Sequence, residues 1–196
     1  MGLWGATDAD ESKPKWMTTA QKKEVLATTA GWVVEAGSTM TGNDNTSSTP
    51  EVLVAAGGLT TSLGAATITS AEWITTTADK SDGFTLSIRV RYNEAVDVAV
   101  SNPTIAVTNS NAGSGSGRGP HTLTYASGTG TNELVFSLVI AAANAATNAD
   151  DVLSIAAQSI TLASSSTIKD AGTTTVSERV ITSAQGTACG TITVTA

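Results

Sequence analysis

The sequence contains little of what most enzyme sites are built from. It has one cysteine, one histidine, 4% aromatic and 14% charged residues among 196. The lone Cys189 cannot form an internal disulfide, so the inter-sheet bridge of antibody domains is excluded and the core must hold by packing. His121 is the only candidate base for a Ser-His-Asp or Cys-His arrangement, and nothing in the sequence brings Cys189 near it. We therefore expect no enzyme, and we expect His121 to be an exposed residue at the entry of a strand.

Positive charge and long apolar runs are also scarce, and this limits the classes of partner that the chain can bind. The net charge of −7 opposes binding to a phosphate backbone. No run approaches the roughly 18 apolar residues that a membrane-spanning helix needs. Residues 1–15 contain Asp8, Asp10 and Glu11 and no apolar stretch of the kind found in a secretory signal. We expect neither a nucleic acid nor a membrane as partner, and no export through the general pathway.

Metal ligands are few as well. Zinc requires three or four His, Cys or carboxylate ligands, which one histidine and one cysteine do not readily supply. Asn148, Asp150 and Asp151 lie close in sequence, and calcium prefers such oxygen ligands, with Asp97 or Asp170 as further candidates in space. A polar turn without metal accounts for the same residues. We predict no cofactor, with Asp150 and Asp151 as the weak metal candidates.

Threonine, serine, glycine and asparagine are abundant, and this mixture suits short strands joined by tight turns. Residues 84–92 alternate apolar and polar side chains as a half-buried antiparallel strand does. Residues 134–140 repeat the pattern with more apolar positions, so this strand is expected to be central. Weaker patterns predict strands at residues 68–74, 96–100, 104–107, 123–125, 152–155, 176–181 and 191–195. The sequence therefore predicts an all-β fold of the sandwich type.

The first 50 residues differ from the rest, because they contain three of the four tryptophans. The pair Thr18 and Gln21 has capping-box spacing, and residues 20–28 are mostly good helix formers, which predicts one short helix ending by Gly31. Residues 32–34 follow as a short strand or an apolar anchor, and residues 38–50 have the composition of a linker. We expect an N-terminal arm and linker at residues 1–50 and one β-sandwich at residues 51–196.

Residues 83–172 resemble the bacterial immunoglobulin-like repeats of large surface proteins and phage proteins. Such repeats run from an aromatic-led strand into an acidic turn, then into a Tyr-x-Ser-Gly-x-Gly-Thr hairpin and an Ile-x-Asp-x-x-Gly turn. The matching segments here are residues 84–92, 94–96, 125–132, 151–153 and 168–172. The resemblance implies an immunoglobulin-like β-sandwich. Thr173 departs from the asparagine that this family often has after the last glycine, which argues against a cation at that turn.

The opening LWGATD followed by KPKW is similar to the start of small virion structural proteins in tailed phages of marine cyanobacteria. This resemblance covers about 35 residues at most. It implies a multi-copy virion protein, assembled in the host cytoplasm, whose partners are the major capsid protein or other virion subunits. A homo-oligomer is left open.

Tryptophans in a polar segment favour docking on a partner, since tryptophan is enriched at binding hot spots. Packing against the chain's own sandwich is the alternative. The predicted partner-binding residues are Trp4, Lys13, Lys15, Trp16 and Trp32. The leading hypothesis is a capsid decoration or cement protein that docks through its N-terminal arm. A tail or neck component of the same virion and a bacterial surface adhesion module remain the alternatives.

Overall fold

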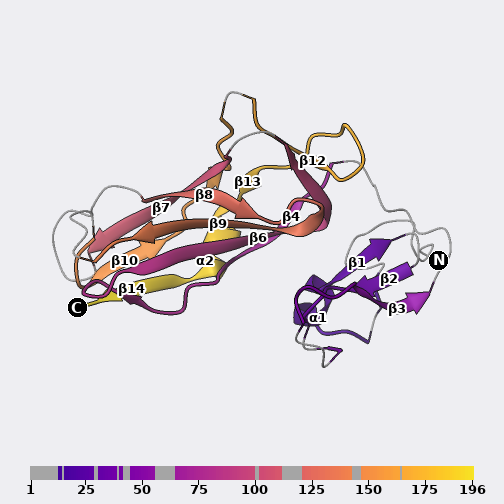
Figure 1. Cartoon of the computed structure of the whole chain (residues 1–196), viewed down its shortest axis with the longest axis horizontal. Coiled ribbons are helices and arrows are strands. Elements are labelled where there is room, and N and C mark those ends of the chain that lie inside the picture. The colour runs from indigo at the N-terminus through magenta and orange to yellow at the C-terminus, as the bar shows by residue number, and fades with distance from the viewer. Residues whose placement is uncertain are drawn as a thin grey trace.

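A computed structural model describes residues 13–14, 16–28, 31–38, 40–41, 45–55, 65–99, 102–111, 121–142, 147–163 and 165–196. These residues form two β-rich parts, a small N-terminal sheet and a large curled sheet (Figure 1). The all-β expectation is confirmed. Neither helix found in the described ranges is long and apolar enough to cross a membrane.

The small sheet has three antiparallel strands in the order β1-β2-β3. Its elements are α1 (Thr19–Lys23), β1 (Val25–Thr28), β2 (Gly31–Val34) and β3 (Glu51–Ala55). Thr18 and Gln21 form the predicted capping box, each side chain bonding to the backbone N–H of the other. The helix is shorter than predicted, because the residues from Val25 onward pair with β2 as a strand. Here cross-strand pairing outweighs helix propensity.

The boundary expected at residue 50 is wrong, because Glu51–Ala55 pairs with β2 and so belongs to the small sheet. This sheet also has a core of its own, made by Met17, Val25, Trp32 and Val34. Within residues 13–55 the described segments thus form a small packed unit of α1 and β1 to β3, where the sequence predicted an arm and linker. Residues 1–12 of the expected arm lie outside the described residues.

The large sheet has nine strands, which follow the order β12-β6-β9-β8-β7-β10-β14-β5 with β4 added beside β6. Its strands are β4 (Ile68–Trp73), β5 (Ala78–Asp79), β6 (Phe84–Ala99), β7 (Thr104–Asn111), β8 (His121–Ser127), β9 (Thr131–Ile140), β10 (Asp151–Ser154), β12 (Thr167–Asp170) and β14 (Thr191–Thr195). A separate pair consists of β11 (Gln158–Ser159) and β13 (Val180–Ile181). Only the β14–β5 pair among these is parallel.

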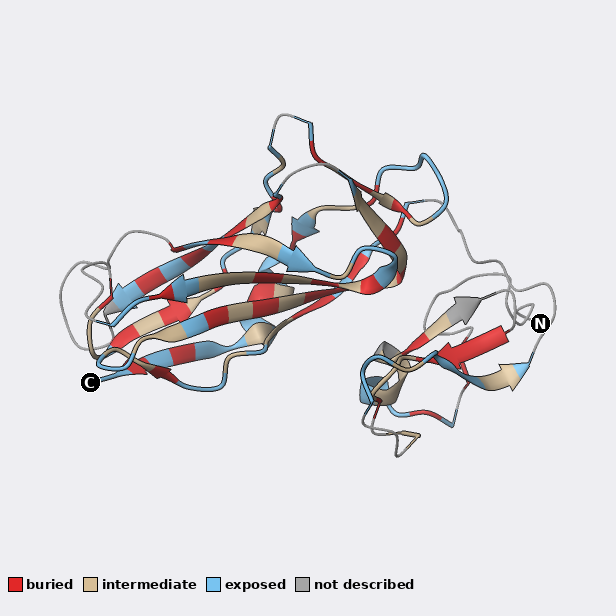
Figure 2. Cartoon of the chain, viewed as in Figure 1, coloured by how far each residue is buried: buried red, intermediate tan, exposed pale blue. Residues whose placement is uncertain are grey.

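The core of the large sheet follows the predicted alternation. Buried positions alternate with less buried ones along β6 and β9, as the colour bands of Figure 2 show. β9 lies between β6 and β8, so it is central as predicted. The buried apolar residues come from strands throughout the sheet and form one cluster. Burial of this apolar surface is the main stabilising contribution to the fold.

Several elements of the large part depart from the sequence prediction. Residues 183–189, to which the sequence analysis assigned no element, form the helix α2 (Ser183–Cys189), whose N-terminus carries a second capping box between Thr182 and Gln185. Residues 168–170 were assigned to a turn, but they lie in β12, which pairs with the second half of β6. The strand predicted at residues 176–181 is reduced to β13 and an isolated bridge at Val176.

Candidate functional site

The structure divides the predicted partner-binding residues into three groups. Trp4 and Lys15 lie outside the described residues. Trp16 is 64% exposed, so its ring is accessible on the surface of the small unit. Trp32 is fully buried in the small core, and Lys13 is 4% exposed with its Nζ donating to the carbonyl oxygen of Lys22 at 2.9 Å. Trp32 and Lys13 therefore hold the small unit together, and we drop both from the proposed contact set.

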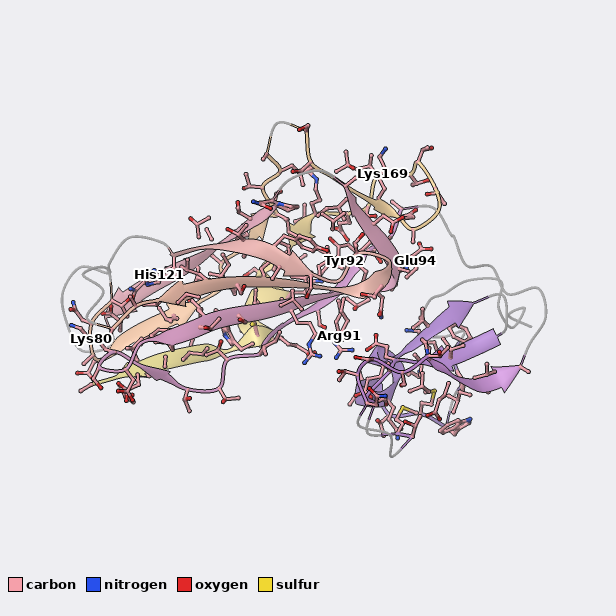
Figure 3. The ribbon with its side chains drawn as sticks, in the orientation of Figure 1. Lys80, Arg91, Tyr92, Glu94, His121 and Lys169 are labelled. Carbon is pink, nitrogen blue, oxygen red and sulfur yellow. The ribbon has the colours of Figure 1, made fainter. Side chains whose placement is uncertain are left out.

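A cluster of charged side chains joins the small unit to the large sheet, and we call it the joint. It consists of Glu35, which follows β2, with Glu72 of β4, Arg89 and Arg91 of β6, and Glu133 of β9. The side chain of Arg91 is only 7% exposed. In Figure 3 it extends from β6 toward the small unit. These residues are far apart in sequence, and only the fold brings them together.

Arg91 lies at the centre of the joint and contacts three carboxylates. Its Nη2 is 2.6 Å from Glu133 Oε1, and its Nη1 is 3.3 Å from Glu35 Oε2. Its Nε is 3.7 Å from Glu72 Oε2. Arg89 adds a forked contact, since its Nη1 is 3.3 and 3.4 Å from the two carboxylate oxygens of Glu133. The ion pair with Glu35 is the contact that reaches across to the small unit.

Glu35 is the least ordinary group in the joint. Burial, followed by the charge of Glu133, raises the pKa of Glu35 to about 7, although Arg91 and the Asn132 side chain act in the opposite direction. Burial penalises the charged form of a carboxyl group, and a like charge nearby adds to that penalty. Glu35 therefore changes charge near neutral pH, which an exposed glutamate does not do.

The joint borders a cleft of about 570 Å³ between the two parts. Glu35, Arg89, Arg91 and Glu133 line it together with hydroxyl and amide groups such as that of Asn132. The cleft brings the carboxylates of Glu35 and Glu133 close to the guanidinium groups of Arg89 and Arg91. This arrangement can hold two structural parts together and can respond to protonation.

His121 is buried, so the expectation of an exposed residue is wrong. It begins β8 as expected and is 5% exposed. Its Nε2 lies 2.9 Å from Thr147 Oγ1 and 3.3 Å from Asn109 Nδ2. Burial lowers its pKa, while the charge of Asp151 acts the other way. Because Nε2 contacts a hydroxyl and an amide, the arrangement is that of a hydrogen-bonded core histidine.

The metal candidates are not gathered into a site. Asp150 is exposed with a φ of 67°, while Asp151 is buried and accepts from the backbone N–H of Asn148 at 2.8 Å. Asp97 and Asp170 belong to the paired strands β6 and β12 instead. In the part of the chain that the structure describes, no three His, Cys, Asp or Glu residues are placed to hold a metal ion.

The sequence prediction missed the joint altogether. Arg89 and Arg91 were taken as the polar face of a half-buried strand, which would leave them in water. The one available signal was their alternation beside β9, where Arg91 pairs in register with Glu133. Opposite charges facing each other across two strands are a known stabilising pair. The burial of this pair depends on the small unit, and no local pattern predicts that contact.

Comparisons with protein-family models, with curated proteins and with solved structures found no match for this chain.

Proposed function

We propose that this chain is a structural subunit of a tailed-phage particle, a decoration or cement protein attached through its N-terminal part. The partner is the major capsid protein or another virion subunit. The large sheet, which we propose to be an immunoglobulin-like sandwich, is the part presented outward. The two resemblances of the sequence are the basis of the phage assignment. The separate hydrophobic cores of the two parts support separate roles, attachment for the small unit and outward presentation for the large sheet.

The observation that carries the attachment role is the exposure of Trp16. Its unit has a separate small core, so Trp16 is not needed to complete the packing of the large sheet. A 64% exposed tryptophan leaves a large apolar surface in water, and burying it against a partner is favourable. Val52 of β3 is also exposed, at 53%, and adds apolar surface to the same unit.

The alternatives are a tail or neck subunit of the same particle and a bacterial surface adhesion module. A tail or neck subunit would use the same N-terminal attachment in a ring, and so it shares the role of Trp16. An adhesion module would use the large sheet as its binding surface. Copy number separates the first alternative from a decoration protein, because a decoration protein is present in numbers comparable with the capsid subunits.

The first test is quantitative mass spectrometry of purified particles. We expect the protein in a copy number comparable with that of the major capsid protein. A copy number per particle no larger than the number of subunits in one ring would favour the tail or neck alternative over the decoration role. Absence of the protein from particles would contradict the proposal as a whole.

The attachment surface is tested by Trp16→Ala in a binding assay with particles that lack the protein. If Trp16 is a hot spot, its loss weakens attachment by about 2 kcal/mol or more, roughly 30-fold in affinity. Val139→Ala is the matched control, because Val139 is 75% exposed on the large sheet. Equal affinity of the two variants would show that Trp16 is not part of the anchor.

A further inference from the structure

We propose that the joint is a proton-controlled connection, which holds the small unit against the large sheet when Glu35 is neutral and loosens when Glu35 is ionised. This inference stands apart from the phage assignment. It rests on the cluster, on its burial and on the cleft that it borders.

Among the described residues, the charged cluster around Arg91 connects the small unit to the large sheet. In the part of the chain that the structure describes, the buried apolar residues form two separate clusters, one in each part. Within the charged cluster, the ion pair of Glu35 with Arg91, at 3.3 Å, links the two parts. A contact that depends on one buried charged cluster responds strongly to a change of charge within that cluster.

The charges around Glu35 come from every element packed against it. The neighbouring carboxylates are Glu24, Glu72 and Glu133, and the neighbouring cations are Arg89 and Arg91. Three carboxylates against two guanidinium groups leave the cluster at −1 when Glu35 is neutral and at −2 when it is ionised.

Ionisation of Glu35 therefore adds a second unbalanced negative charge at a side chain that is only 17% exposed. Glu133 is the main repelling group, and it already shares Arg91 and Arg89. The positive charge of Arg91 lowers the pKa of Glu35, but burial and the charge of Glu133 together raise it by more. Separation of the two parts would return Glu35 to water, where the charged form is well solvated.

The sign of the pH dependence follows from that raised pKa. When the parts are together, Glu35 keeps its proton up to about pH 7, and its ordinary value is 4.5. The joined state thus binds the proton more tightly, so the stabilisation is complete below pH 4.5 and is lost as the pH rises to about 7. Between pH 5 and pH 8 the ratio of joined to separated molecules should fall by about 70-fold for this size of shift.

The test is a distance measurement between the two parts of the full chain. Spin labels at Thr49→Cys and Ala126→Cys, in a Cys189→Ser background, place one exposed label on each part. Double electron–electron resonance should give one narrow distance at pH 5 and a broader distribution with longer distances at pH 8. Identical distributions at the two pH values would overturn the proposal.

Two variants identify the group responsible. Glu35→Gln mimics the neutral carboxyl, so the narrow distance should persist at pH 8. Glu51→Gln, an exposed substitution on β3, should respond to pH as the parent chain does. A pH response that survives in Glu35→Gln would rule out Glu35 as the controlling group. Far-UV circular dichroism at both pH values verifies that each variant keeps its strands.

Discussion

At the scale of single residues, burial separates side chains that look alike in the sequence. Trp16 and Trp32 both lie in the first 50 residues, yet one is exposed and the other completes the small core. Their spacing and composition do not distinguish them, because Trp32 is buried by packing with Met17, Val25 and Val34, which only the folded small unit brings together. The sequence identified the tryptophans as candidate contact residues, but it could not tell which of them is buried.

Phe136 is the residue on which the large core depends most clearly. It is fully buried on the central strand β9 and meets Tyr125 edge-on, with ring centroids 6.1 Å apart. Phe136→Ala should lower the free energy of unfolding by about 3–5 kcal/mol, because it leaves a cavity that the sheet cannot fill. Urea denaturation measures this loss.

The matched control for Phe136→Ala is Val139→Ala on the same strand. Val139 is 75% exposed, so its truncation should change the free energy of unfolding by no more than about 0.5 kcal/mol. Similar losses for the two variants would contradict the central position of Phe136.

At the scale of elements, the sequence predicted those strands whose own pattern alternates. β4, β9 and β14 fall where the sequence places them, since one face of each is buried. The strands expected separately at residues 84–92 and 96–100 are joined in the single strand β6. α2 was missed because its sequence has no apolar stripe. It is positioned by a tertiary contact in which the backbone of Gly186 lies so close to the carbonyl of Ile155 that a side chain would not fit.

The β8–β9 hairpin was predicted from the Tyr-x-Ser-Gly-x-Gly-Thr segment, and the structure confirms the turn. The backbone N–H of Thr129 donates to the hydroxyl of Tyr125 at 2.8 Å, and Gly128 has a φ of 114°. A Cβ at Gly128 would collide with the carbonyl oxygen of Glu133. Gly128→Ala should therefore destabilise the chain by about 2 kcal/mol more than Gly172→Ala does, measured as the difference in unfolding free energy.

Gly172 is the matched control for this hairpin, because it also has a positive φ, 73°, but nothing lies within 4 Å of an added Cβ. Its replacement by alanine carries the conformational cost alone, about 1 kcal/mol. Equal effects of the two substitutions would show that the hairpin backbone moves to accommodate a side chain.

At the scale of the whole molecule, the sequence predicted two parts and misjudged what the first one is. Composition separated residues 1–50 from the strand-rich remainder, whereas β3, which the sequence assigned to the sandwich, pairs with β2 of the small sheet. The joint between them was beyond prediction, since Glu35, Arg91 and Glu133 are separated by dozens of residues. Their proximity depends on how a nine-stranded sheet curls and on where the small unit lies against it.

The last prediction follows from the separation of the two cores. The buried apolar cluster of the large sheet runs from Ala66 to Val194 and includes no residue of the small unit. A fragment of residues 65–196 should therefore fold alone with a β-type circular dichroism spectrum and a cooperative thermal transition. The cost of removing the small unit should be limited to the joint, where Arg91 and Glu133 become hydrated and still pair with each other. The transition should lie within several degrees of that of the full chain, and an unfolded fragment would show that the small unit is required for the large sheet to form.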